Sequence, residues 1–279
     1  MSITLAMDVG ATNARVALVD TVDGDIVSRV KVPVAGRKSR ELLVECRAYA
    51  DELLQGLQPR TVGVSVCETV ARNGEITSHT TLDWTKDMVE AVFGDLAPLT
   101  IESDVVAAGI AEHRLGLARG LQSFLVVNVG SGVSSSLFIN GAPWRGHHGL
   151  AILIGEEPIA AERLGGGMAL AARAGLVDGA SVLHAAEHGD VRCAEICDSG
   201  ARAVGSAIGF AINLIDPAAV IVSGGVVRHS ERFRYELVRA AVATTWRIED
   251  RSTCIQFSDL GDDVALIGAA LSAGTKVRS

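Results

Sequence analysis

Three glycine-containing turns follow apolar, strand-like runs in this sequence, and each could hold a phosphate group. They lie at Gly10, at Gly130 and at Gly224-Gly225. Glycine lets the backbone approach a ligand because it has no Cβ, and backbone N–H groups at such turns bind phosphate oxygens. The hydroxyl side chains of Thr12 and Ser131 stand within the first two turns. A single turn of this kind is ordinary hairpin chemistry, but the set favours a phosphate site.

The first two turns sit in matching sequence contexts. When Met7–Thr12 is placed over Val127–Gly132, a polar residue, a valine and a glycine fall in register at an offset of 120 positions, with Asp8 over Asn128. Internal similarity at that spacing predicts two domains of related design. The P-loop pattern is absent from the sequence, and Gly165–Gly167 follows a helical stretch where a dinucleotide fingerprint would follow a strand.

The bulk composition is that of a globular protein with excess negative charge. The chain has 279 residues, of which 48% are hydrophobic and 21% charged, enough for two modest domains with a core. Its formal net charge of −8 argues against nucleic acid as the main partner. Anionic small ligands remain compatible, because backbone N–H groups hold phosphates without net positive charge.

The cysteines and the first residues of the sequence indicate in which cellular compartment the protein is expected. Five cysteines at irregular spacing do not indicate a disulfide framework. Cys193 and Cys197 could share a metal, but no second Cys or His pair lies near them in sequence, so buried thiols are favoured. We expect no secretory leader before the run Ile3–Met7, because no basic segment followed by a long apolar one is present. No apolar stretch reaches the ~18–20 residues of a membrane span. We therefore expect a cytoplasmic protein without a membrane partner.

Strands and helices are expected in mixed order along the chain. Periodicity and turn residues predict strands at 4–9, 14–20, 26–34, 61–66, 99–102, 124–129, 133–139, 219–222 and 254–257. They predict helices at 39–55, 104–117, 160–174, 182–188, 193–214, 231–244 and 265–273. Hairpins open each half, so the expected class is α/β with mixed sheets and not a plain parallel doubly wound fold.

Several of these segments resemble motifs of one superfamily. The first phosphate motif of the actin/hexokinase superfamily resembles Asp8-Val9-Gly10-Ala11-Thr12-Asn13, the second resembles Val129–Val133, and the adenosine motif resembles Ala219–Gly225. Within that superfamily the chain is most similar to the ROK family of sugar kinases, and more distantly to bacterial glucokinases. Further matches follow the family's order at Glu102–Gly109, Asn213–Pro217 and Leu266–Ala270. The resemblance covers nearly the whole chain and implies a two-lobed, ribonuclease H-like fold.

The resemblance implies an ATP- and Mg²⁺-dependent kinase with Asp104 as its general base. The alternative is that Asp104 only caps a helix, a role that Ser103 could also fill. The two roles are compatible, since the helix dipole favours the ionised carboxylate that a base needs. The nucleotide-binding residues that the resemblance implies are Gly10, Ala11, Thr12, Asn13, Gly130, Ser131, Gly132, Gly224 and Gly225, together with Asp8.

Asp8 is implied as the residue that holds Mg²⁺, usually through water. Such an ion keeps several waters and needs only one or two carboxylates. The alternative is a carboxylate that stabilises the turn at the end of a strand. Arg15 is predicted to be a surface or inter-strand residue and not a phosphate ligand.

The sugar-recognition segment departs from the family pattern. Glu156 in Gly155–Ile159 replaces the histidine that contacts sugar and zinc, and Leu153 replaces a sugar-binding glutamate. Glu162 matches the later sugar-binding glutamate, and Ser103 stands where an asparagine usually contacts a hydroxyl. The family's cysteine-rich loop is missing, so no zinc site is expected. A solvated acidic loop is the alternative for Glu156.

These departures put ordinary glucose recognition in doubt. Changing which polar groups face a closed site shifts specificity, because an unpaired buried group costs on the order of 1–3 kcal/mol. The acceptor could be a hexose, an amino sugar such as kanosamine, or a cyclitol, phosphorylated at its 6-OH or the equivalent position. An acidic side chain at Glu156 could pair with an ammonium group.

Two other functions remain open. A catalytically degenerate sugar sensor is possible, although the family's repressors carry a helix-turn-helix before the first phosphate motif. An actin- or chaperone-like ATPase would usually be longer. We expect a small lobe at 1–112 with the final helix 265–279, a larger lobe at 113–264, closure over the substrate, and a homodimer.

Overall fold

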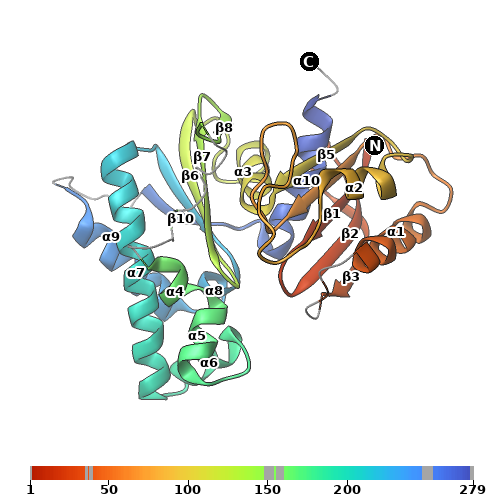
Figure 1. Ribbon diagram of the computed structural model, residues 1–279. Coiled ribbons are helices and arrows are strands. Elements are labelled where there is room, and N and C mark those ends of the chain that lie inside the picture. Colours follow the sequence, from red (N-terminus) through yellow and green to blue (C-terminus); the bar gives the residue numbers. More distant parts are fainter. Residues whose placement is uncertain are drawn as a thin grey trace. The chain divides into compact units, whose positions relative to one another are not determined.

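The computed structural model describes residues 2–34, 37, 40–147, 154, 160–246 and 254–276 (Figure 1). The chain forms two compact units. Unit 1 comprises Met1–Arg119, Arg145–Leu150 and Asp263–Ser279, and unit 2 comprises Gly120–Trp144 and Ala151–Asp262. Within the described residues, no helix is both long and apolar enough to span a membrane.

Unit 1 is built on a five-stranded mixed sheet with the order β3-β2-β1-β4-β5. Its strands are β1 Ile3–Val9, β2 Asn13–Asp20, β3 Ile26–Pro33, β4 Val62–Val66 and β5 Leu99–Ser103. The central strand β1 pairs antiparallel with β2 and parallel with β4, and β4 pairs parallel with β5. Every residue of β4 is buried, as expected for a short parallel strand covered on both faces.

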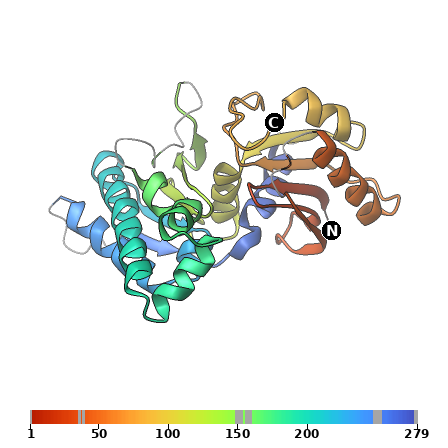
Figure 2. The ribbon, with the colours of Figure 1, turned by 60° about the horizontal axis from the view of Figure 1, so that its bottom comes forward.

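Helices cover both faces of this sheet (Figure 2). They are α1 Arg40–Leu54, α2 Lys86–Phe93, α3 Asp104–Arg114 and α10 Val264–Lys276. Alternate side chains of β1 separate the faces: Leu5 packs in the cluster with α1, and Ala6 packs in the cluster with α10. The approach of α10 requires glycine at two positions, because a Cβ on Gly63 would overlap the backbone of Ala269 and one on Gly268 would overlap Ala107.

Unit 2 repeats the same plan, with the sheet order β10-β9-β6-β7-β8. Its strands are β6 Ser123–Val129, β7 Val133–Ile139, β8 Ala142–Trp144, β9 Ala219–Ser223 and β10 Ile255–Phe257. The central strand β6 pairs antiparallel with β7 and parallel with β9, as β1 does with β2 and β4. The predicted internal repeat therefore corresponds to a repeated sheet topology.

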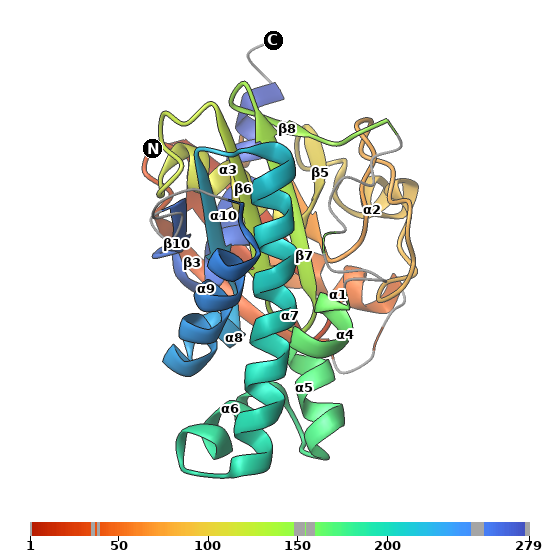
Figure 3. The ribbon, with the colours of Figure 1, turned by 90° about the vertical axis from the view of Figure 1, so that its left-hand side faces the viewer.

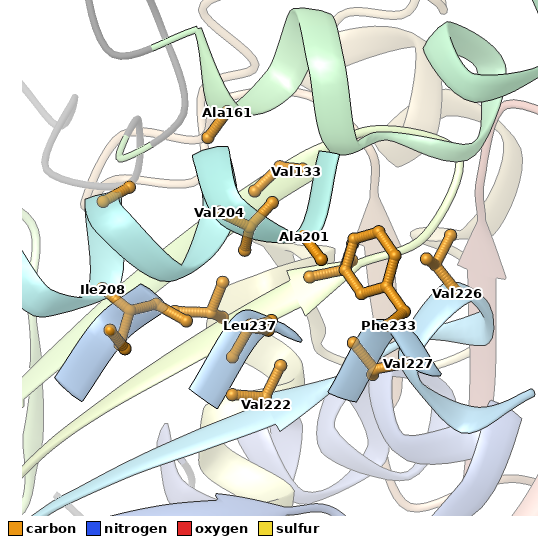
Figure 4. Close-up of a cluster of buried hydrophobic side chains, with 14 of the residues drawn as sticks. Val133, Ala161, Ala201, Val204, Ile208, Val222, Val226, Val227, Phe233 and Leu237 are labelled. Atoms are coloured by element: carbon orange, nitrogen blue, oxygen red, sulfur yellow. The ribbon is translucent and has the colours of Figure 1, made fainter. Parts of the chain in front are cut away.

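The helices of unit 2 pack around one long helix. They are α4 Ala161–Gly165, α5 Gly167–Ala174, α6 Gly179–Glu187, α7 Val191–Ile215, α8 Gly225–Arg228 and α9 Glu231–Thr244. Figure 3 shows α7 running between α9 and the α4–α5 pair. The core beneath it joins Val204 of α7, Phe233 of α9 and Val222 of β9 (Figure 4).

The predicted α/β class with mixed sheets is confirmed, and the helical prediction at 160–174 needs one refinement. The segment 160–174 forms two helices, because Gly166 is extended (φ −66°, ψ 145°). A Cβ on Gly166 would lie 2.9 Å from the Ser131 carbonyl oxygen, so contact with the second turn interrupts the helix there. The sequence prediction also missed α2, α8 and the short strand β8.

Candidate active site

The carboxyl ends of three parallel strands meet at one edge of the unit 1 sheet. In the register, Val9 of β1 pairs with Val66 of β4, and Val66 pairs with Ser103 of β5. The next residues along each strand are therefore neighbours, which places the first glycine turn, Cys67 and Asp104 together. In open α/β sheets this edge is where ligands bind.

Asp8 lies at this edge with both carboxylate oxygens engaged. Ser65 Oγ donates to Oδ1 at 2.6 Å, and Arg15 Nη1 donates to Oδ2 at 3.0 Å. Burial raises the pKa of Asp8, while the hydrogen bond from Ser65 and the charge of Arg15 oppose that rise. Arg15 stands directly opposite Asp8 in the β1–β2 ladder and also pairs with Asp263. It is an inter-strand residue, as predicted.

The first turn is closed by its own backbone. Gly10 N–H donates to the Asn13 carbonyl at 3.0 Å, and Val34 N–H donates to the Thr12 carbonyl at 2.9 Å. Thr12 is exposed, while Gly10, Ala11 and Asn13 are partly exposed. Because the Gly10 amide is used inside the turn, phosphate contacts would have to come from the groups at its tip.

Asp104 is the first residue of α3, and the pKa of its carboxyl group is raised. Burial raises its pKa to about 7, aided by the charges of Asp8 and Glu68 and opposed by a hydrogen bond from Val105 N–H. That bond to Oδ1 measures 2.6 Å. The helix dipole was expected to favour the ionised carboxylate, but burial shifts the pKa in the opposite direction. Asp104 is also not the helix cap, a position taken by Ser103.

Ser103 presents a buried hydroxyl beside Asp104. The residue is 1% exposed, and its Oγ has no hydrogen-bond partner within the described part of the chain. It makes no side-chain bond to the start of α3. An unsatisfied buried hydroxyl is unfavourable by about 1–3 kcal/mol, which a ligand hydroxyl could relieve.

Sequence reasoning missed Glu68, which follows β4 at the same edge. It is 4% exposed, and its carboxylate accepts hydrogen bonds from Ser78 Oγ and from the N–H groups of Thr80, Thr81 and Leu82. Burial raises the pKa of Glu68, but these hydrogen bonds outweigh it and hold the pKa below its usual value. In the sequence Glu68 is only an acidic residue two positions after a buried β-branched run, and nothing local indicates its hydrogen-bond partners.

The second turn lies at the matching edge of the unit 2 sheet. Gly130 N–H donates to the Gly132 carbonyl at 2.9 Å, and Gly167 N–H at the start of α5 donates to the Gly130 carbonyl at 2.8 Å. Glu162 of α4 accepts a hydrogen bond from Val133 N–H and lies against Gly132. The carbonyl of Ser131 accepts from Met168 N–H at 3.0 Å. The predicted sugar ligand Glu162 is thus fixed at the second turn.

The predicted adenosine motif joins the same edge of unit 2. Asn128 pairs in register with Ser223, so Gly224 follows beside the second turn. Gly224 has φ +104°, and a Cβ there would overlap the Val129 carbonyl, so only glycine fits without strain. Gly225 then begins α8.

The structure thus gathers the predicted residues at two edges. Unit 1 brings together Asp8, the first turn, Ser103 and Asp104, while unit 2 brings together the second turn, Glu162 and Gly224-Gly225. The predicted sugar segment 155–159, with Glu156, and Leu153 lie outside the described residues.

Comparison with known proteins settles the family. A family model described as the ROK family matches residues 4–276, nearly the whole chain. The chain belongs to the ROK family. The resemblance predicted from the motifs is confirmed.

Relatives of this ROK protein include enzymes and solved structures. A ROK family glucokinase from Streptomyces griseus, solved with glucose and AMPPNP, is 24% identical with a TM-score of 0.83, covering 98% of this chain and 99% of that one. A ROK hexokinase from Thermus thermophilus is 24% identical with a TM-score of 0.78 and 99% coverage of both chains. A beta-glucoside kinase of Listeria monocytogenes is 27% identical over 145 residues, half of this chain and 48% of that protein.

Across the described part of this ROK protein, no group of three or more His, Cys, Asp or Glu side chains is placed to hold a metal ion. The residues around position 156 fall outside that part, so the predicted lack of a zinc site stays a prediction.

Proposed function

We propose that this protein is an ATP-dependent kinase that transfers a phosphoryl group to a hydroxyl of a hexose or related sugar. The observation that carries the proposal is the buried carboxyl of Asp104 at the sheet edge of unit 1 that also bears Asp8, with its pKa raised by burial to about 7. Support also comes from relatives named as a glucokinase, a hexokinase and a beta-glucoside kinase.

Asp104 acts as the general base. The acceptor O–H donates its proton to the carboxylate as the oxygen attacks the γ-phosphorus, the bond to the bridging oxygen breaks, and ADP leaves. A base with a pKa near the working pH accepts a proton effectively while a large fraction stays ionised. Asp8, at longer range, contributes to that pKa.

Asp8 fits the role of the magnesium-holding carboxylate. Each of its oxygens accepts one protein hydrogen bond, so a lone pair remains on each for a water of the hydrated ion. Bound Mg²⁺ would neutralise charge on the β- and γ-phosphates. Arg15 and Ser65 keep the carboxylate in one orientation.

The nucleotide contacts are assigned unit by unit. In unit 1 they are Gly10, Ala11, Thr12 and Asn13, and in unit 2 they are Gly130, Ser131, Gly132, Gly224 and Gly225. Exposed Thr12 supplies a hydroxyl, and the glycines allow close backbone approach. The functional lobes remain 1–112 with 265–279, and 113–264.

The acceptor contacts are Ser103, Glu162 and Glu156, in addition to Asp104. The unsatisfied Ser103 hydroxyl supports a polyhydroxyl ligand. The finer proposal is transfer to the 6-OH, or its equivalent, of a hexose, an amino sugar such as kanosamine, or a cyclitol. We also propose that the protein forms a homodimer and is located in the cytoplasm.

The test is a coupled ATP-consumption assay over hexoses, amino sugars and cyclitols with wild type, Asp104→Asn and the exposed control Asp83→Asn. Asp104→Asn should lose about 10²–10⁴-fold in kcat while ATP still binds, because the general base is gone. Wild-type kcat/KM should fall as the pH drops below about 7, because protonated Asp104 cannot accept a proton. Near-normal turnover by Asp104→Asn would overturn the base assignment. ATP binding without turnover on any acceptor would favour the sensor function.

A further inference from the structure

The loop between β4 and α2 turns back on itself and is held by one carboxylate. After β4, the chain forms a small hairpin in which Val70 bridges Ile76 and Thr77 N–H donates to the Thr69 carbonyl at 2.8 Å. The hairpin returns the chain to Glu68. From there residues 77–82 lead into α2.

Glu68 fastens the returning segment almost entirely through backbone groups. Thr80 N–H donates at 3.1 Å to one oxygen, and Leu82 N–H donates at 2.8 Å to the other. Thr81 N–H and Ser78 Oγ complete the set. Hydrogen bonds to a charged acceptor are stronger than those between neutral groups, so the carboxylate dominates the position of this segment.

This fastened segment lies beside the proposed base. The register places Val66 against Ser103, so Cys67-Glu68 and Asp104 begin adjacent segments at the sheet edge. The charge of Glu68 helps to raise the pKa of Asp104. Burial raises the pKa of the Cys67 thiol to about 12, and the charge of Asp104 adds to that rise. Thr81 hydrogen-bonds that same thiol. The segment is therefore close to the point where an acceptor hydroxyl must meet Asp104.

We propose that Glu68 is a positioning residue that fixes residues 77–82 as a wall of the acceptor site beside Asp104. This rests on the proposed kinase function. Glu68 itself touches no substrate, because its oxygens are occupied by the segment. Its anchoring of three consecutive N–H groups leaves the Thr80 and Thr81 side chains in defined places, exposed and half-buried respectively. Displacing a positioning loop by ~1 Å can lower the reaction rate by about a hundredfold.

The decisive variant is Glu68→Gln, with Glu75→Gln as control. The amide side chain keeps the shape of the glutamate but offers one acceptor oxygen instead of two, so part of the segment loses its anchor. Glu75 is exposed in the same hairpin and is not among the groups that hold residues 77–82. The Michaelis constant for the acceptor should rise about tenfold or more in Glu68→Gln, with that for ATP within about twofold of wild type. Glu75→Gln should match wild type.

Two further readouts separate positioning from a merely structural role. The groups that act on Asp104 are Asp8, Glu68 and the Val105 amide, and the Glu68 charge raises its pKa. Glu68→Gln should therefore move the acidic limb of the kcat/KM profile to lower pH. Amide hydrogen exchange should speed up at residues 80–82 in Glu68→Gln and more so in Glu68→Ala, with the β1–β5 amides unchanged.

Each outcome decides between the two proposals. If wild type phosphorylates an acceptor but Glu68→Gln keeps its acceptor Michaelis constant, the Glu68 inference is wrong and the kinase stands. Equal rises in the ATP and acceptor constants, with faster exchange throughout unit 1, would show a general structural role and also overturn it. If wild type transfers phosphate to no acceptor, both proposals fail.

Discussion

The two sheets share one topology but differ in charge where their central strands end. In unit 1, Asp8 pairs in register with Arg15 on one side and Ser65 on the other. In unit 2 the matching position is Asn128, flanked by Ser134 and Ser223. An ionic cluster in one unit thus corresponds to a neutral one in the other.

The neutral cluster of unit 2 shows that this architecture forms without a buried charge. Unit 2 builds a strand, a glycine turn and a returning strand around three neutral residues, Asn128, Ser134 and Ser223. Ser223 Oγ contacts Asn128 Oδ1 there at 3.5 Å. The buried charge of Asp8 is therefore not a requirement of this architecture, and since burying charge is unfavourable, its presence indicates chemistry.

The turns are also stabilised in different ways. The first turn has residues 10–13 between paired Val9 and Ala14, and the second has residues 130–132 between paired Val129 and Val133. The second is shorter by one residue, and Glu162 and the start of α5 hold it in place. The first keeps an exposed tip. The second turn is thus held by contacts from α4 and α5, whereas the buried carboxylate of Asp8 lies beside the first.

Among exchanges between the two units, the largest effect is expected when the charged cluster is made like the neutral one. Asp8→Asn should lower kcat/KM by about 10²–10³-fold, because the amide cannot neutralise or orient a hydrated Mg²⁺. The fold should persist, since Asn128 shows that an amide fits this position and Arg15 keeps Asp263 as a partner. Steady-state kinetics with a magnesium titration, together with thermal unfolding, measures both.

Asn128→Asp is the matched control for Asp8→Asn. It places a carboxylate in unit 2 without an arginine opposite, so it should lower stability and leave the magnesium dependence unchanged. A fully active Asp8→Asn at ordinary Mg²⁺ concentration would contradict the assignment of charge chemistry to unit 1.

A smaller effect, on stability, is expected at the ends of β4 and β9, the strands that pair in parallel with the central strands β1 and β6. Val66 and Gly224 occupy equivalent positions beside Val9 and Val129. Val66 continues the strand, whereas Gly224 turns with φ +104° against the Val129 carbonyl. Gly224→Val should cost about 2–4 kcal/mol of unfolding free energy, through positive φ and steric overlap.

Val66→Gly provides the reverse exchange, measured by urea denaturation. It removes a buried side chain without strain, and should cost about 1.5–3 kcal/mol by lost burial. Nucleotide affinity should fall only in Gly224→Val, since this glycine belongs to the proposed adenosine motif. If Gly224→Val were as stable as wild type, the left-handed turn would not be required at this position.

The repeated strands and turns were readable from sequence because each depends on local pattern. An apolar run followed by a glycine indicates the end of a strand, and this pattern is visible in the sequence at Gly10 and at Gly130. Glu68 was not readable, because its partners at 78–82 are brought to it only by the folded hairpin. The raised pKa of Asp104 was not readable for a related reason: it comes from burial and from the charges of Asp8 and Glu68, which belong to other segments of the chain. The break at Gly166 likewise depends on contact with the second turn.

The smallest expected difference compares the two serines that support the central strands. Ser65 Oγ donates to the Asp8 carboxylate at 2.6 Å, while Ser223 Oγ contacts the Asn128 amide oxygen at 3.5 Å. Ser65→Ala should cost about 1.5–3 kcal/mol of unfolding free energy and Ser223→Ala only about 0.5–1.5 kcal/mol, because the first bond is made to a charged group. Since the Ser65 bond lowers the pKa of Asp8, its loss should also leave Asp8 protonated up to a higher pH, so the Ser65→Ala deficit in activity should shrink as pH rises. Denaturation of both variants and activity from about pH 5 to 9 test this, and equal costs with parallel pH profiles would show that the two clusters work alike despite their difference in charge.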